Sequence, residues 1–139
     1  MNLYKQNKSL FVLDDDAIFH RIMALANKSN SFRISHHYEV KSLLIYLWNH
    51  RDDYEGLPDV VFADLTLPLY DGWYFLNGYK TIRSWLCKDI SVYVVSASIS
   101  KVDTERVATY PFVKQYITKP VPMDKLREIA EHKSYKISA

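Results

Sequence analysis

Cysteine and glycine are scarce in this sequence of 139 residues, which contains one cysteine, Cys87, and three glycines. A single thiol cannot form an intrachain disulfide, so the composition fits a reducing compartment. Three glycines are too few for the glycine-rich loops, such as GxGxxG or GxxxxGK[ST], that cradle phosphates in nucleotide-binding folds. If the chain handles phosphate, it must do so by other means.

Long apolar runs and a strong charge of one sign are also missing. No segment approaches the roughly 18 consecutive apolar residues of a membrane span, and the N-terminus lacks the features of a signal peptide. Lys and Arg number 18 against 16 Asp and Glu, a net charge of +2, whereas a nucleic-acid binder needs a concentrated basic face. We therefore expect a soluble, cytoplasmic protein with one domain over residues 1–139 (core about 8–132), and no membrane or nucleic-acid partner.

Short apolar runs alternate along the chain with longer segments of helical periodicity. The runs predict strands at residues 9–13, 32–38, 60–63, 90–95 and 112–117. The periodic segments predict helices at residues 17–28, 40–50, 73–86, 101–110 and 123–131. Such alternation is typical of an α/β fold, with a doubly wound parallel sheet of five strands flanked by five helices. Ligands bind such sheets at the carboxyl ends of the strands.

Chemically active side chains follow four of these predicted strands. They are Asp14, Asp15 and Asp16, then Asp64, then Ser96, then Lys119. Crowded carboxylates repel one another, and a hard cation such as Mg²⁺ relieves the repulsion. A carboxylate can attack phosphorus, and a cation, a lysine and a hydroxyl can stabilise the transferred group. The strand ends therefore contain every part of an aspartyl-phosphate site.

Four segments in this order carry a resemblance to a known family. They are FVLDDDAIFHRI, PDVVFADLTLPLYDGWYFL, VYVVSAS and YITKPVPMDKL. The chain resembles a response-regulator receiver domain, the CheY-like phosphoacceptor module of two-component signalling, in its stand-alone form. The resemblance extends from Leu10 to about Ile129 and implies a flavodoxin-like sheet with strand order 2-1-3-4-5.

The resemblance also implies a role for each matching acidic position. Asp64 falls on the phosphoacceptor, and Asp15 on the direct Mg²⁺ ligand. Asp14 falls on the acidic residue that acts largely through water. Thr66, two residues beyond Asp64, would offer its backbone carbonyl to the metal.

Three further positions match the phosphoryl-binding and switch residues of the family. Ser96 and Lys119 would bind the phosphoryl oxygens, and Lys119 precedes a proline, Pro120, whose peptide bond is usually cis in this family. Tyr116 falls on the aromatic switch position, which moves together with Ser96. The helix predicted at 101–110 departs from the family in its weak helical pattern and is followed by Pro111.

The resemblance implies a signalling protein that is not itself classed as an enzyme. A histidine kinase or a histidine phosphotransfer protein would donate the phosphoryl group, and an unknown downstream protein would bind the switched surface. One alternative is a small Mg²⁺ phosphohydrolase resembling the haloacid-dehalogenase superfamily, with Asp14 as nucleophile and Asp16 completing a D-x-D pair. Another is an interaction module that works without phosphorylation.

Two groups of residues have simpler interpretations. Asp is a favoured N-cap, so Asp16 is expected to cap the first helix. His20, His36 and His37 have no further cluster with metal-ligand spacing, and neighbouring strand residues point to opposite faces. We therefore interpret these three histidines as core or surface residues.

Overall fold

Five parallel strands form one sheet in the computed structural model, which describes residues 7–28 and 31–131. The order across the sheet is β2-β1-β3-β4-β5. The strands are β1 (Lys8–Leu13), β2 (Phe32–His37), β3 (Val60–Ala63), β4 (Ser91–Ser96) and β5 (Val113–Thr118). The predicted doubly wound fold and its strand order are confirmed. The chain ends of the expected domain, 1–6 and 132–139, lie outside the described residues.

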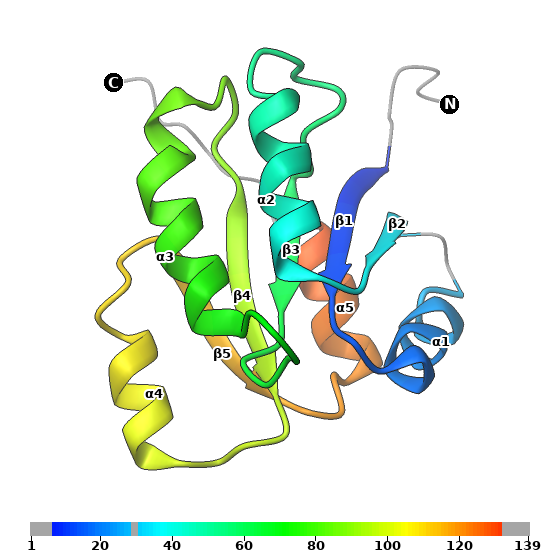
Figure 1. Ribbon diagram of the computed structural model, residues 1–139. Coiled ribbons are helices and arrows are strands. Elements are labelled where there is room, and N and C mark those ends of the chain that lie inside the picture. Colours follow the sequence, from blue (N-terminus) through cyan, green and yellow to red (C-terminus); the bar gives the residue numbers. More distant parts are fainter. Residues whose placement is uncertain (1–6, 29–30, 132–139) are drawn as a thin grey trace, which may run out of the picture.

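Helices cover both faces of the sheet (Figure 1). On one face lie α1 (Ala17–Ala26) and α5 (Met123–Glu131), whose apolar side chains Phe19, Met23, Leu126 and Ile129 belong to one buried cluster. On the other face lie α2 (Val40–Asn49), α3 (Gly72–Ile82) and the short α4 (Lys101–Val107). Figure 1 shows α2 and α3 side by side in front of the sheet, with α5 behind it.

Strand β1 shows why the three central strands, β1, β3 and β4, are apolar along most of their length. Leu10 and Val12 point to the cluster under α1 and α5, while Phe11 and Leu13 point to the cluster under α2 and α3. Because both faces of a parallel sheet are covered, neither set of alternating side chains meets water. The apolar run therefore ends where β1 leaves the sheet, at Asp14.

Several helices end earlier than the sequence pattern predicts. Helix α1 ends at Ala26, because the Asn27 amide group bonds both the N–H and the carbonyl of Phe32 at the start of β2. Helix α4 ends at Val107. A proline disfavours helical backbone angles in the residue before it, so Pro111 prevents the helix from continuing through Tyr110. The helix predicted at 73–86 breaks after Ile82 into a 3₁₀ turn, η1 (Arg83–Trp85).

The start of α3 packs directly on the backbone that follows β3. The N–H of Gly72 donates to the carbonyl of Leu65 at 3.0 Å. A Cβ atom at position 72 would lie 2.6 Å from the Cα of Leu65 and also against the carbonyl of Asp64. Only glycine allows this approach, which brings the first turn of α3 against the end of β3.

No helix within residues 7–28 and 31–131 combines the length and the apolar composition needed to cross a membrane.

Candidate functional site

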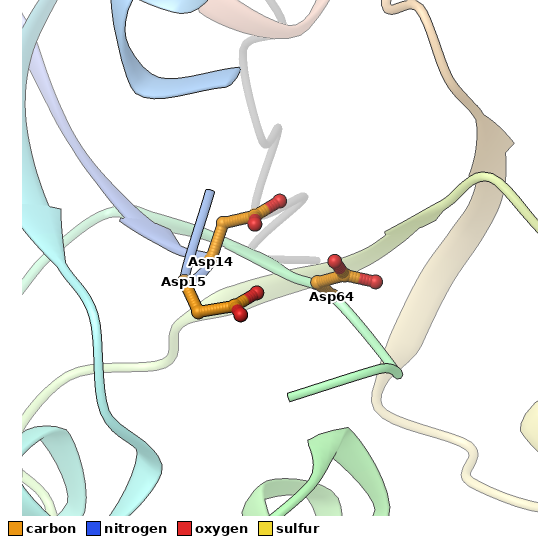
Figure 2. A group of neighbouring side chains, drawn as sticks. All are labelled: Asp14, Asp15 and Asp64. Atoms are coloured by element: carbon orange, nitrogen blue, oxygen red, sulfur yellow. The ribbon is translucent and has the colours of Figure 1, made fainter. Parts of the chain in front are cut away.

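Three carboxylates gather at the carboxyl edge of the sheet. Asp14 and Asp15 follow β1, and Asp64 follows β3, its neighbour in the sheet. A ligand oxygen from each of the three lies within 4.8 Å of the others. Figure 2 shows the Asp14 and Asp15 side chains extending from the end of β1 toward the side of Asp64. The right-handed crossovers thus bring together residues that are 50 positions apart in the sequence.

Lys119 joins two of these carboxylates from the end of β5. Its Nζ donates to Oδ2 of Asp14 at 2.6 Å and to Oδ2 of Asp64 at 3.1 Å. The same Nζ lies 4.3 Å from the centre of the Phe19 ring on α1. The Lys119 N–H donates to the carbonyl of Ser96 at 2.9 Å, and the Lys119–Pro120 peptide bond is cis. Lys119 therefore links the ends of β1, β3, β4 and β5.

Burial and charge act in opposite directions on these groups. Burial raises the pKa of Asp64 above its ordinary value, and Asp14 adds to the rise, while the Thr66 N–H and Lys119 oppose it. Burial alone would lower the pKa of Lys119, but the hydrogen bonds and charges of Asp14 and Asp64 outweigh it and raise that pKa. The ammonium group is therefore firmly charged beside the two carboxylates.

Asp14 is 1% exposed and has a partner for each of its polar groups. Its N–H donates to the carbonyl of His37, and its own carbonyl lies 2.7 Å from Nε2 of His20. Its Oδ1 accepts the N–H of Asp16, while Lys119 occupies Oδ2. Asp15 is exposed. The acidic pair thus consists of one fixed carboxylate and one that faces solvent.

The other candidate residues occupy the same edge of the sheet. The Thr66 N–H donates to Oδ1 of Asp64 at 3.2 Å. Ser96 is buried at the end of β4, where its Oγ accepts the N–H of Ser98 at 3.1 Å. Within the described part of the chain, Ser96 makes no hydrogen bond to Asp64, so its tie to the acidic cluster is the backbone bond from Lys119.

Tyr116 connects β5 to the loop that leads into α4. Its hydroxyl donates to the carbonyl of Ser98 at 2.8 Å. The Ser98 hydroxyl in turn donates to Oδ2 of Asp103 at 3.1 Å, in the first turn of α4. A chain of hydrogen bonds therefore runs from Ser96 through Ser98 to α4, with Tyr116 attached to it.

Two residues near the site were not identified from the sequence. Phe19 lies under the Lys119 ammonium, and His20 contacts the Asp14 backbone. Both lie on the buried face of α1 with Met23. Helical spacing places position 20 on that face, so a polar side chain there is a signal that could have been used.

The fold and the site together define the class of this protein, a CheY-like receiver domain. Comparison with protein families agrees, because the family model of the response regulator receiver domain matches residues 10–131. The chain belongs to this family, which consists of signalling modules of two-component systems.

The individual relatives share only part of their sequence with this chain. The probable methanogenesis regulatory protein FilR2 of Methanothrix harundinacea is 36% identical over 96 residues, which are 68% of this chain and 60% of that protein. A two-component response regulator from Cytophaga hutchinsonii superposes with a TM-score of 0.77 at 18% identity, covering 89% of this chain and 95% of that one.

A third comparison concerns a metal. The receiver domain of sensor histidine kinase PA1611 from Pseudomonas aeruginosa superposes with a TM-score of 0.72 at 14% identity, covering 90% of this chain and 95% of that one. That structure is described with a magnesium ion coordinated in its active-site cleft.

The residues of the present chain are chemically suited to the same kind of ion. Three carboxylates face one ammonium, which leaves an excess of two negative charges. Oxygen donors with excess negative charge are the ligands that Mg²⁺ prefers.

Proposed function

We propose that this chain is the phosphoacceptor of a two-component phosphorelay, with Asp64 as the residue that receives the phosphoryl group. The observation that carries the proposal is the position of Lys119, whose ammonium lies 2.6 Å from Asp14 and 3.1 Å from Asp64. An ammonium held beside Asp64 can pair with an oxygen of a phosphoryl group that is transferred to that carboxylate. An ordinary surface lysine would lie in solvent instead.

The transfer itself is a simple displacement at phosphorus. A carboxylate oxygen of Asp64 forms a bond to the phosphorus of a phosphohistidine, and the phosphorus–nitrogen bond breaks with its electron pair remaining on the imidazole. Lys119 would then pair with a phosphoryl oxygen, and Ser96 would offer its hydroxyl to another. Both residues stabilise charge that is spread over the phosphoryl oxygens.

Asp14, Asp15, Asp64 and the backbone carbonyl of Thr66 would hold Mg²⁺ at this site. The bound ion would supply positive charge that offsets the repulsion between Asp64 and the incoming phosphoryl group. The excess of negative charge in the acidic cluster supports this assignment.

The signal would leave the site through the loop between β4 and α4. When Ser96 turns toward a phosphoryl oxygen, its Oγ leaves the N–H of Ser98. The carbonyl of Ser98 accepts the Tyr116 hydroxyl, and the Ser98 hydroxyl donates to Asp103. Tyr116 and α4 would then move together, and an unidentified downstream protein would bind the changed surface.

The donor would approach over α1, which begins beside the acidic pair. Ile18, Ile22 and Leu25 form an exposed apolar stripe on this helix, 69%, 44% and 58% exposed. Their spacing puts them on one face. We infer that a helix of a histidine kinase or phosphotransfer protein packs there in the cytoplasm, where a kinase has access to its nucleotide.

The alternative of a phosphohydrolase that uses Asp14 and Asp16 receives little support. Asp16 caps α1 by accepting the N–H of Ile18, as the sequence predicts, and it is not part of the cluster of Asp14, Asp15 and Asp64. The D-x-D pair therefore presents no second carboxylate to a substrate beside Asp14. We assign the chain a signalling role, with the kinase supplying most of the catalysis.

Acetyl phosphate provides the test, with intact mass as the measurement. We expect the wild type to gain one phosphoryl group in the presence of Mg²⁺, and Asp64→Ala to gain none. Asp16→Asn is the matched control and keeps its label, because it changes only the cap of α1. Label that persists in Asp64→Ala would refute the assignment. Absence of label from both acetyl phosphate and a phosphorylated donor protein would favour an interaction module.

A further inference from the structure

His20 is a buried polar residue to which the proposed phosphotransfer assigns no role. It is the fourth residue of α1 and is 3% exposed. Both ring nitrogens have partners, since Nε2 lies 2.7 Å from the carbonyl oxygen of Asp14 and Nδ1 lies 2.7 Å from Nδ1 of His36. Buried polar atoms usually have hydrogen-bond partners, and for His20 one of these partners is the backbone of the acidic pair.

The directions of these two hydrogen bonds follow from the chemistry of the groups. A carbonyl oxygen only accepts, so Nε2 of His20 is the donor. A neutral imidazole that carries its proton on Nε2 presents a lone pair on Nδ1, so His36 donates from its own Nδ1. His36, on β2, therefore selects the form of His20 that can hold the Asp14 carbonyl.

The carbonyl that His20 holds is part of the peptide unit between Asp14 and Asp15. That unit is planar, and the two acidic side chains branch from the Cα atoms at its two ends. The chain before it is held separately, because the Asp14 N–H donates to the carbonyl of His37. The Asp16 N–H also donates to Oδ1 of Asp14 across this unit. The contact with His20 holds the carbonyl side of the peptide plane, and with it the direction in which Asp15 leaves the backbone.

We propose that His20 is a positioning residue for the acidic pair, and that the link from His36 through His20 to the Asp14 carbonyl sets the affinity of the site for a divalent cation. The inference rests on the proposed function, because it concerns the cation that the acidic cluster would bind. Residues that orient the ligands of a metal typically change its affinity by roughly 10- to 100-fold when they are replaced.

Titration calorimetry with MgCl₂ tests the proposal on three variants. His20→Leu fills the space but cannot donate, and we expect its dissociation constant for Mg²⁺ to rise roughly tenfold. His20→Gln places an N–H donor close to the position of Nε2, and we expect it to restore affinity to within about threefold of the wild type. His36→Leu, at an exposed position, removes the hydrogen-bond donor to Nδ1 of His20. We expect its dissociation constant for Mg²⁺ to lie between those of His20→Leu and His20→Gln.

A control separates positioning from stability. His50 also bonds a backbone carbonyl, that of Tyr46 through Nδ1 at 2.8 Å, but it lies at the end of α2 away from the acidic pair. We expect His50→Leu to lower the melting temperature without changing Mg²⁺ affinity. Melting temperatures of all variants, measured in EDTA, show whether affinity follows stability.

Each outcome has a distinct meaning. Wild-type affinity in both His20→Leu and His36→Leu would overturn the inference and leave the phosphoacceptor function standing. Equal weakening in His20→Leu and His20→Gln would also overturn it, because the restored donor would then have no effect. If His20→Leu does not fold, the His36→Leu and His20→Gln pair decides in the same way. Failure of the wild type to bind Mg²⁺ would overturn the proposed cation site itself.

Discussion

At the scale of single residues, Lys119 offsets part of the negative charge of the acidic cluster formed by Asp14, Asp15 and Asp64. It is the cation beside Asp14 and Asp64, whose side chains are 1% and 9% exposed. Removing one partner of a buried ion pair leaves the other charge without compensation, which costs roughly 3 kcal/mol or more. We expect Lys119→Met to lower the free energy of unfolding by about this amount in EDTA, as measured by urea denaturation. Added Mg²⁺ should recover more stability in this variant than in the wild type.

Lys88 supplies the matched control for this prediction. Its side chain is also largely buried, and its Nζ pairs with Asp59 at 3.1 Å and with two backbone carbonyls. It lies just before β4, at the opposite edge of the sheet from the acidic cluster. Lys88→Met should therefore lose stability that Mg²⁺ does not return. Equal responses of the two variants to Mg²⁺ would contradict the role given to Lys119.

At the scale of elements, the junction between β3 and α3 has the tightest requirement. A side chain at position 72 would press on the backbone of Asp64 and Leu65, which cannot move without displacing the Asp64 carboxylate. We expect Gly72→Ala to destabilise the fold by roughly 2 kcal/mol, as overpacking does. Thermal unfolding measures the loss, and slower labelling by acetyl phosphate would show the displacement of Asp64.

Gly78 in the middle of α3 offers the comparison. A Cβ there would lie 2.6 Å from Cδ1 of Leu44, the end of a side chain that can rotate. Alanine also favours a helix over glycine by roughly 1 kcal/mol. Gly78→Ala should therefore stay within about 1 kcal/mol of the wild type. Comparable losses at positions 72 and 78 would mean that crowding on the backbone is not the cause.

The elements also show what the sequence could and could not predict. The apolar strands and their polar ends predicted the sheet and the meeting of Asp14, Asp64 and Lys119, because parallel strands end at one edge. The early end of α1 depends on tertiary contacts, the Asn27 bonds to Phe32, that periodicity does not contain. Helical spacing could have placed His20 on the buried face of α1, but not its contacts, since its partners lie on other elements.

At the scale of the whole molecule, the free energy of unfolding at acidic pH depends on His37, the last residue of the edge strand β2. Burial, followed by the charges of His20 and His36, lowers the pKa of His37 to about 4 from 6.5. Its ring packs 4.5 Å from the Phe11 ring, centre to centre. The folded state thus keeps His37 neutral down to about pH 4, while the unfolded chain takes up a proton near pH 6.5.

The sign of the effect follows from this difference. Between about pH 6.5 and pH 4 the unfolded state binds more protons at this residue, so the free energy of unfolding falls as the pH falls. We expect urea denaturation to show a smaller loss over this range in His37→Gln, which cannot titrate. Subtracting the two profiles cancels the contributions of the carboxylates. Parallel profiles would refute the contribution of His37.

The unequal anchoring of Asp14 and Asp15 has a consequence for redesign of the site. The four polar groups of Asp14 tie together β2, α1, the turn before α1 and the end of β5. Any replacement there disturbs four neighbours at once, whereas Asp15 presents its carboxylate to solvent. Selectivity for a larger ion, which takes more oxygen ligands at longer distances, is therefore best sought by changing the length or charge of residue 15.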